Sequence, residues 1–267
     1  MPAPARTLET AAGQVWIFDE LETLWESAAD RIAQTIQSQV QARQKAVLGL
    51  ATGGTPVGVY RALVKSHQSR PLPFPQVSTY NLDEYYPISP LDPHSYRAYM
   101  HEHLFSKVDI PSNRAHVLDG TVPESFVETH CAEFDRWIEH DGGLDLQLLG
   151  IGRNGHIGFN EPSDLPEDQA LRLPTRKMAL HPVTKADAAR DFGGDEANVP
   201  SHALTVGTRA ILAARSILIL ATGSAKADAV AKSLQGPISS QMPGSFLQTV
   251  APRVLWMIDR AAASHLA

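Results

Sequence analysis

The strongest constraint on the fold of this chain is a series of short apolar runs rich in Val, Ile and Leu. Gly, Pro, Asp or Asn bounds each run, and most runs are apolar on both faces. This pattern is typical of strands in a sheet that is covered on both sides. The predicted strands are Val15–Phe18, Ala46–Ala51, Gln76–Leu82, Leu144–Ile151, Ala203–Val206, Ser216–Ala221 and Val254–Asp259.

Helical patterns separate these runs. Leu21–Arg43 repeats its apolar residues with a period near that of an α-helix, and Val122–Glu139 begins with a proline that suits a first helical turn. Shorter helices are predicted at Val57–Ser66, Ser95–Phe105, Ala225–Leu234 and Ala261–Leu266. Strands that alternate with helices predict an α/β fold with a mainly parallel sheet, and we expect residues 1–267 to form one domain.

The composition narrows the class of protein. Of the 267 residues, 23 are basic and 29 acidic, a net charge of −6 that disfavours broad nucleic-acid binding. The lone cysteine, Cys131, allows no intrachain disulfide. Residues 1–13 lack the apolar core of a secretory signal, and no apolar run reaches the length of a membrane span. We therefore expect a cytoplasmic protein without membrane or nucleic-acid partners.

One segment, Ser163–Pro200, is less regular than the rest and is rich in Pro, Gly and Asp. A long irregular stretch in a compact enzyme is often a lid over the active site. A surface insertion is the alternative, and composition alone slightly favours it. We predict a lid at about residues 163–200.

Two loops with similar sequences follow predicted strands. In the first, Thr52-Gly53-Gly54-Thr55 leads into a proline; in the second, Thr222-Gly223-Ser224 is followed by Lys226. Glycines let backbone N–H groups approach an anion at the start of a helix. A cation in a helix's first turn is disfavoured unless an anion is present. Together the loops indicate a phosphate site, against the alternatives of plain turns and a solvated lysine.

A carboxylate follows the strand Gln76–Leu82, in Asn81-Leu-Asp-Glu-Tyr-Tyr. Asp83 and Glu84 are adjacent on an extended chain, so their side chains point to opposite faces and only one can enter a given pocket. Asp83 shares the face of Asn81. It is a candidate general base, and the alternative is a capping acid in a loop.

The most distinctive block is Gly-Ile-Gly-Arg-Asn-Gly-His-Ile-Gly-Phe-Asn-Glu-Pro, residues 150–162. It places Asn154 two residues before His156 and Glu161 five residues after it. A nearby carboxylate would fix the histidine's tautomer and raise its basicity. The block is too elaborate for a structural turn, so it predicts a functional site. The sequence contains no His-Glu-x-x-His, no paired cysteines and no Gly-x-Ser-x-Gly, so neither a zinc site nor serine acyl transfer is expected.

Taken together, these blocks resemble the glucosamine/galactosamine-6-phosphate isomerase family. The resemblance extends from about Val15 to Ala261. It implies a modified Rossmann-like three-layer sandwich and the conversion of glucosamine 6-phosphate and water to fructose 6-phosphate and ammonia. It implies no cofactor and a small amino sugar phosphate as the binding partner, and it is compatible with a homo-oligomer. The blocks that carry it are LATGGTP, NLDEYYP, HSYRAYM, GIGRNGHIGFNEP, ALTVG and ATGSAKA.

The resemblance also implies residue roles. Asp83 corresponds to the base that moves a proton from C2 to C1, and His156 to the group that opens the sugar ring. Glu161 and Asn154 correspond to residues that support the histidine, although many members have Asp in place of Asn154. Lys185 aligns with an arginine of the lid that grips phosphate. The expected phosphate pocket comprises Thr52, Gly53, Gly54, Thr55, Lys185 and Lys226.

Other activities remain open at this level. A 6-phosphogluconolactonase shares the Gly-His core but normally lacks the following Phe-Asn-Glu-Pro, so Glu161 favours the deaminase. The substrate could instead be another amino sugar phosphate, such as galactosamine 6-phosphate, and a catalytically idle sugar-phosphate sensor is a third alternative. The stretch Thr175–Leu180 matches the allosteric site of regulated relatives only at Arg176, because Met178 and Ala179 replace polar groups. It predicts an enzyme that N-acetylglucosamine 6-phosphate does not activate.

Overall fold

The computed structural model describes residues 2–266; Met1 and Ala267, the ends of the predicted domain, lie outside the described residues. Its main sheet has eight strands in the order β1-β2-β11-β10-β7-β3-β4-β6, all parallel to their neighbours except β1. The strands are β1 Arg6–Thr10, β2 Gly13–Phe18, β3 Ala46–Leu50, β4 Val77–Asn81, β6 Ala115–His116, β7 Leu146–Gly150, β10 Ile217–Ala221 and β11 Val254–Asp259.

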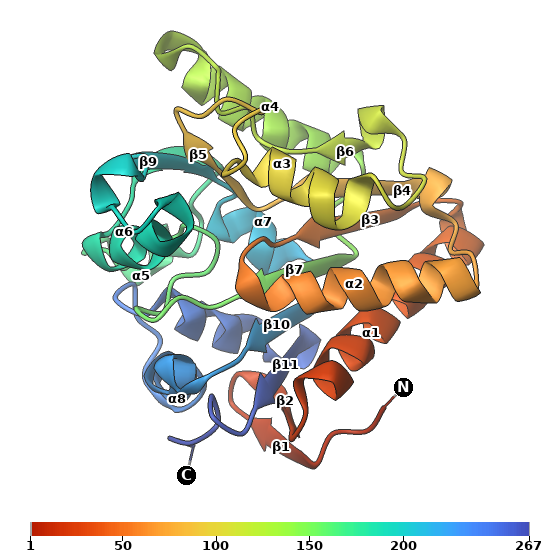
Figure 1. Cartoon of the computed structure of the whole chain (residues 1–267). Coiled ribbons are helices and arrows are strands. Elements are labelled where there is room, and N and C mark those ends of the chain that lie inside the picture. The colour runs from red at the N-terminus through yellow and green to blue at the C-terminus, as the bar shows by residue number, and fades with distance from the viewer. Residues whose placement is uncertain (1, 267) are drawn as a thin grey trace.

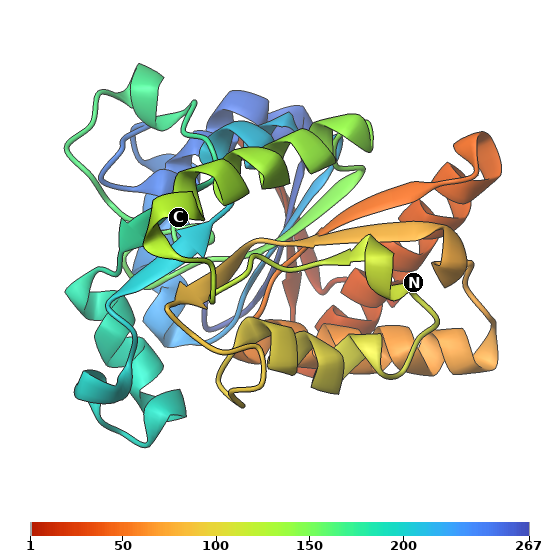
Figure 2. The same ribbon diagram turned by 90° about the horizontal axis from the view of Figure 1, so that it is seen from above.

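The helices cover both faces of this sheet, and Figure 2 shows α2 and α3 on one side and α4 on the other. The α-helices are α1 Leu21–Arg43, α2 Gly54–Ser69, α3 Tyr96–Met100, α4 Val127–His140, α5 Glu167–Ala170, α6 Pro182–Ala189, α7 Thr208–Ala213 and α8 Ala227–Gln235. A π-helical turn, His101–Phe105, extends α3, and 3-10 turns include Ser224–Lys226, Arg190–Phe192 and Pro243–Arg253. The predicted α/β three-layer architecture is therefore confirmed.

Burial explains why the strands read as apolar on both faces. Every residue of β3, β4 and β10 is buried, because helices cover the sheet from both sides. Helix α1 buries one face, including Leu24, Ile32 and Ile36, which matches the predicted period. Within residues 2–266, no helix is long and apolar enough to cross a bilayer.

A second, antiparallel sheet accounts for the main error in the predicted strands. The run Ala203–Val206 does not join the main sheet. It belongs to β9, His202–Thr205, which pairs with β5, Asp83–Tyr86, and with β8, Arg176–Ala179. Within β9, Ala203 packs in a small separate core with Tyr85, Phe159 and Phe192, and Leu204 packs in the main core. The predicted helix Ala261–Leu266 is also wrong, because these residues form turns.

The segment predicted as a lid is folded. Residues 163–200 contain α5, β8, α6 and two 3-10 turns, and they stand with β9 at one side of the molecule (Figure 1). The small core with Tyr85 holds this segment through Leu180, Ala188 and Phe192. Its attachment to the second sheet places α6 beside the carboxyl ends of β3 and β7, where the candidate site lies.

Candidate active site

A cavity of about 220 Å³ lies at the carboxyl ends of the central parallel strands. In open α/β sheets, ligands bind at this edge. Its walls come from the loops after β3, β4, β7 and β10 and from α6 with the 3-10 turn that follows it. Among the predicted site residues, those that line it are Thr52, Gly53, Gly54, Thr55, Asp83, His156 and Lys226.

The two similar loops meet in the structure. The hydroxyls of Thr55 and Thr222 lie 3.1 Å apart. Gly53 and Gly223 have φ angles of 100° and 87°, a region that favours glycine, and each precedes a helical turn. A Cβ added at Gly53, Gly54 or Gly223 would meet no atom within 4 Å. The loops therefore leave room for a group that approaches their backbone amides, as a phosphate would.

Lys226 provides the cation that the second loop predicted. It ends the turn Ser224–Lys226, directly before α8, and lines the cavity. Burial lowers its pKa below the usual range; the carboxylate of Asp187 opposes this shift, and Arg153 and Arg190 add to it. Within residues 2–266, Lys226 forms no ion pair, because Asp187 is bonded to Arg153 at 2.5 Å. An anion in the cavity would supply the missing partner.

Asp83 begins β5 and is only 6% exposed. Burial, and next the negative charge of Glu84, raise its pKa to about 8. No described residue donates a hydrogen bond to its carboxylate, although the group lines the cavity. A carboxylate with few partners and a pKa near neutrality can both take and return a proton.

The predicted histidine block assembles into a hydrogen-bonded group. Nδ1 of His156 lies 3.2 Å from Oε2 of Glu161, and Nδ2 of Asn154 donates to the same oxygen at 2.8 Å. Burial would raise the pKa of Glu161, but the donors His156, Thr184 and Asn154 together lower it. An ionised Glu161 assigns the ring proton to Nδ1, which leaves Nε2 to exchange a proton with a ligand.

A glycine is required beside this histidine. A Cβ on Gly152 would lie 2.4 Å from the His156 ring, so only glycine lets the ring occupy this position. Thr184 of α6 also reaches the group, with its hydroxyl 3.2 Å from Nδ1 of His156. Thr184, which lies in the segment predicted as a lid, thus contacts His156 directly.

The structure does not bring Lys185 to the cavity lining, whereas Arg190, five residues later, lies there. The sequence motifs did not predict five further residues of the lining, which are Arg190, Tyr85, Tyr96, Thr184 and Asp187. Helix α6 contributes Thr184 and Asp187 to the lining, and the 3-10 turn after it contributes Arg190. The segment contains other basic residues, so sequence alone did not single out Arg190.

A family model and two curated relatives match most of this chain. The model of the family "Glucosamine-6-phosphate isomerases/6-phosphogluconolactonase" matches residues 19–256. Glucosamine-6-phosphate deaminase of Rhodopirellula baltica is 45% identical over 241 residues, which cover 90% of this chain and 92% of that protein. Glucosamine-6-phosphate deaminase 2 of Bacillus subtilis is 43% identical over 217 residues, 81% of this chain and 84% of its own.

Solved structures extend the comparison. A monomeric glucosamine-6-phosphate deaminase superposes with a TM-score of 0.87 at 40% identity, over 94% of this chain and 99% of its own. A 6-phosphogluconolactonase from Trypanosoma brucei has a TM-score of 0.77 at 17% identity, over 98% of this chain and 100% of its own, a likeness of fold alone. The chain belongs to the glucosamine-6-phosphate isomerase/6-phosphogluconolactonase family.

Proposed function

We propose that this chain is a glucosamine-6-phosphate deaminase, which converts glucosamine 6-phosphate and water to fructose 6-phosphate and ammonia. The observation that carries the proposal is one cavity that holds three elements: an anion cradle, the carboxylate of Asp83 and the His156–Glu161 pair. The reaction needs all three. Deaminases that are 43–45% identical over most of the chain support the same choice.

The phosphate binds at the paired glycine loops. Backbone amides at Gly53 and Gly54, the hydroxyls of Thr52 and Thr55, and Lys226 surround the open part of the cavity. Arg190 offers a planar guanidinium in the same lining, and Lys185 stays a prediction from the alignment. Binding energy at the phosphate, remote from the reacting carbons, holds C2 near the base.

Ring opening comes first, because the C2 proton becomes acidic only next to a free aldehyde. Nε2 of His156 takes the proton from the O1 hydroxyl and delivers it to the ring oxygen O5 as the C1–O5 bond breaks. Glu161 stabilises the transient imidazolium through Nδ1, and Asn154 holds Glu161 in place. Asn154 brings no charge, so the relay rests on His156 and Glu161.

Asp83 then takes the C2 proton, and the C2 ammonium gives one proton to the aldehyde oxygen O1, which leaves an enolamine. Asp83 returns its proton to C1. The product is an iminium at C2, to which water adds. Loss of ammonia from this adduct leaves the ketone, so no electrons are gained or lost and the steps call for no redox cofactor. A base with a pKa of about 8 is well matched to abstraction and return at neutral pH.

The competing activities make different demands on Asp83. Hydrolysis of a lactone requires a base for water but no transfer between C1 and C2, so a lactonase would have no use for Asp83 as a proton carrier. Glucosamine 6-phosphate and galactosamine 6-phosphate differ in one hydroxyl, and we propose the former because the similar relatives are named for it. The setting we propose is carbohydrate metabolism in the cytoplasm, in the breakdown of N-acetylglucosamine.

A paired assay tests the proposal. The purified enzyme should release ammonia from glucosamine 6-phosphate and show little hydrolysis of 6-phosphogluconolactone. Galactosamine 6-phosphate in a parallel reaction tests the epimer, and size measurement in solution decides between monomer and homo-oligomer. Lactone hydrolysis without ammonia release would identify the chain as a lactonase, and binding without either reaction would identify a sensor.

A further inference from the structure

The carboxylate of Glu84 has an unusual set of partners for a buried acid next to a catalytic candidate. It is 1% exposed and accepts three main-chain N–H groups. Oε1 accepts from Tyr85 at 2.9 Å and from Tyr96 at 2.8 Å, and Oε2 accepts from Arg97 at 3.0 Å. The side chain therefore links strand β5 to the start of helix α3.

Helix α3 in turn contacts two parts of the active site. Tyr96 lines the cavity beside Asp83, and the hydroxyl of Tyr99 donates to the carbonyl of Gly53 at 2.7 Å. Gly53 belongs to the proposed phosphate loop. A single carboxylate thus connects the strand that carries the base with the helix that supports the anion cradle.

Adjacent residues of a strand point to opposite faces, so the orientation of Glu84 sets that of Asp83. When Glu84 is held on the α3 side by three amides, Asp83 is directed toward the cavity without bonds of its own. We propose that Glu84 is a positioning residue that fixes Asp83 toward the substrate by tying β5 to α3. This inference rests on the proposed deaminase function and adds a residue that this function does not itself require.

The charge of Glu84 has a second effect. It adds to burial in raising the pKa of Asp83, and burial raises the pKa of Glu84 itself to about 7 against its three amide donors. The other groups that face the pair are Arg97, beside Glu84, and the phenols of Tyr60, Tyr85 and Tyr96, near Asp83. Burial raises the pKa of each phenol, so these three stay neutral from pH 5 to 9. Lys226 and Arg190 lie in the same cavity lining.

The variant Glu84→Gln separates positioning from folding. Its Oε1 can still accept from Tyr85 and Tyr96, but the charge is lost and the amide nitrogen cannot accept from Arg97. We expect kcat to fall roughly tenfold with KM changed less than about twofold, and the acid limb of the pH profile to move to lower pH. Glu84→Ala, which frees α3, should also raise KM because Tyr99 supports Gly53.

A matched control is Asp135→Asn. Asp135 is also buried and accepts from the Thr175 amide at 3.1 Å and from Arg209 at 2.9 Å, but it lies on α4 outside the cavity. This variant should lower the melting temperature and keep the pH profile of the wild type. Rates are divided by the folded fraction for all variants.

An unchanged kcat and pH profile in Glu84→Gln, after this correction, would overturn the inference while ammonia release by the wild type still supported the function. Carbon-13 NMR of Asp-labelled enzyme gives a readout that needs no turnover, with Asp83→Asn to assign the signal. A lower titration midpoint for Asp83 in Glu84→Gln supports the inference even if the wild type released no ammonia. An unmoved midpoint would contradict it.

Discussion

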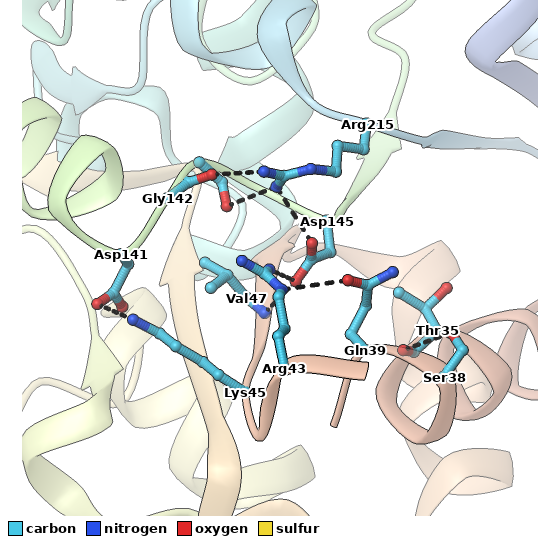
Figure 3. Close-up of polar contacts among 11 residues, drawn as sticks. Thr35, Ser38, Gln39, Arg43, Lys45, Val47, Asp141, Gly142, Asp145 and Arg215 are labelled. Carbon is cyan, nitrogen blue, oxygen red and sulfur yellow. Dashed lines mark hydrogen bonds and ion pairs between the residues drawn. The ribbon is translucent and has the colours of Figure 1, made fainter. Parts of the chain in front are cut away.

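Two buried aspartates lie near opposite edges of the main sheet, and their surroundings contrast. Asp145 precedes β7 at the amino end and is 2% exposed. It binds Arg43, accepts from Arg215 at 3.2 Å and accepts from the Val47 amide at 2.8 Å (Figure 3). Asp83, at the carboxyl end, has no hydrogen bond from a described residue and has a raised pKa. The first carboxylate is bound by two arginines and an amide; the second lines the cavity without such partners, as the proposed base requires.

The cations show the same contrast. At the amino end Lys45 bonds Asp141 at 2.5 Å, and Arg253 donates to the carbonyl of Ala214 at 2.8 Å. A hollow of about 830 Å³ at that end is larger than the candidate cavity, yet Arg215 and Arg253 in its lining are already hydrogen-bonded, and the guanidinium of Arg31 lies over the Trp16 ring. At the carboxyl end Lys226 has no ion pair among the described residues. A charged side chain without a partner, rather than the size of a cavity, therefore indicates where a charged ligand binds.

The largest expected effect on stability is at the amino end. Asp145→Asn leaves two arginines without their shared anion. It should lower the free energy of unfolding by about 2–4 kcal/mol, less than for a fully buried pair, because the side chains of Arg43 and Arg215 are 31% and 52% exposed. Denaturant unfolding measures the change. If Asp145→Asn were as stable as the wild type but less active per folded molecule, the contrast between Asp145 and Asp83 would be contradicted.

The next effect concerns the cations. Lys226→Ala should raise KM for the sugar phosphate about ten- to a hundredfold, or roughly 1.5–3 kcal/mol, with a smaller change in kcat. Lys45→Ala is the matched control, since Lys45 already has a carboxylate partner and lies away from the cavity. Steady-state kinetics of both variants decide the point. Equal KM values would mean that Lys226 does not bind the phosphate.

Ionisation of Asp83 should lower the free energy of unfolding. Its folded pKa of about 8 lies above the ordinary value of 3.8, so the stability linked to this group is fully present below pH 3.8 and is lost as the pH rises through 8. Asp83→Asn cannot ionise and should therefore be more stable than the wild type near pH 8, by about 0.5–2 kcal/mol. The difference should shrink toward pH 4. A variant that is less stable than the wild type at pH 8 would contradict the raised pKa.

The smallest expected effect is regulatory. N-acetylglucosamine 6-phosphate should not change the rate curve, which should be hyperbolic with or without it. Arg176 donates to Asn160 at 2.8 Å, and Lys177 pairs with Glu124 and lies over the Tyr86 ring, so both cations are engaged within the chain. A sigmoidal curve that the acetylated sugar made hyperbolic would refute this expectation.

Local patterns predicted most of the main sheet and several of the residues that line the cavity. Leu21–Arg43 was predicted as one helix and forms α1 over the same residues, because an apolar face at helical spacing has one way to pack. The contacts of His156 could be predicted because its partners are close in sequence. Asn154, His156 and Glu161 lie within one loop, and they form the expected hydrogen-bonded group.

Pairing between distant segments could not be predicted in the same way. Strand β5 contains two acids and pairs with β9, more than a hundred residues later, so neither its composition nor its neighbours indicate a strand. The apolar run in β9 looks like a strand of the main sheet, because periodicity does not specify a partner. Arg190 lines the cavity for the same reason, because the path of the chain after α6, rather than a sequence motif, brings it there, and Lys185 stays a prediction.

The most direct test of the central claim is solvent-deuterium incorporation into fructose 6-phosphate by wild type and Asp83→Asn. We expect the wild type to incorporate deuterium at C1 of fructose 6-phosphate and, when the reaction reverses, at C2 of glucosamine 6-phosphate. Asp83→Asn should bind the sugar phosphate but lose this exchange by about 10²–10⁴-fold, the usual contribution of a general base. Asp145→Asn, corrected for its folded fraction, should exchange at the rate of the wild type. Undiminished exchange in Asp83→Asn would contradict the account, because another group would then carry the proton.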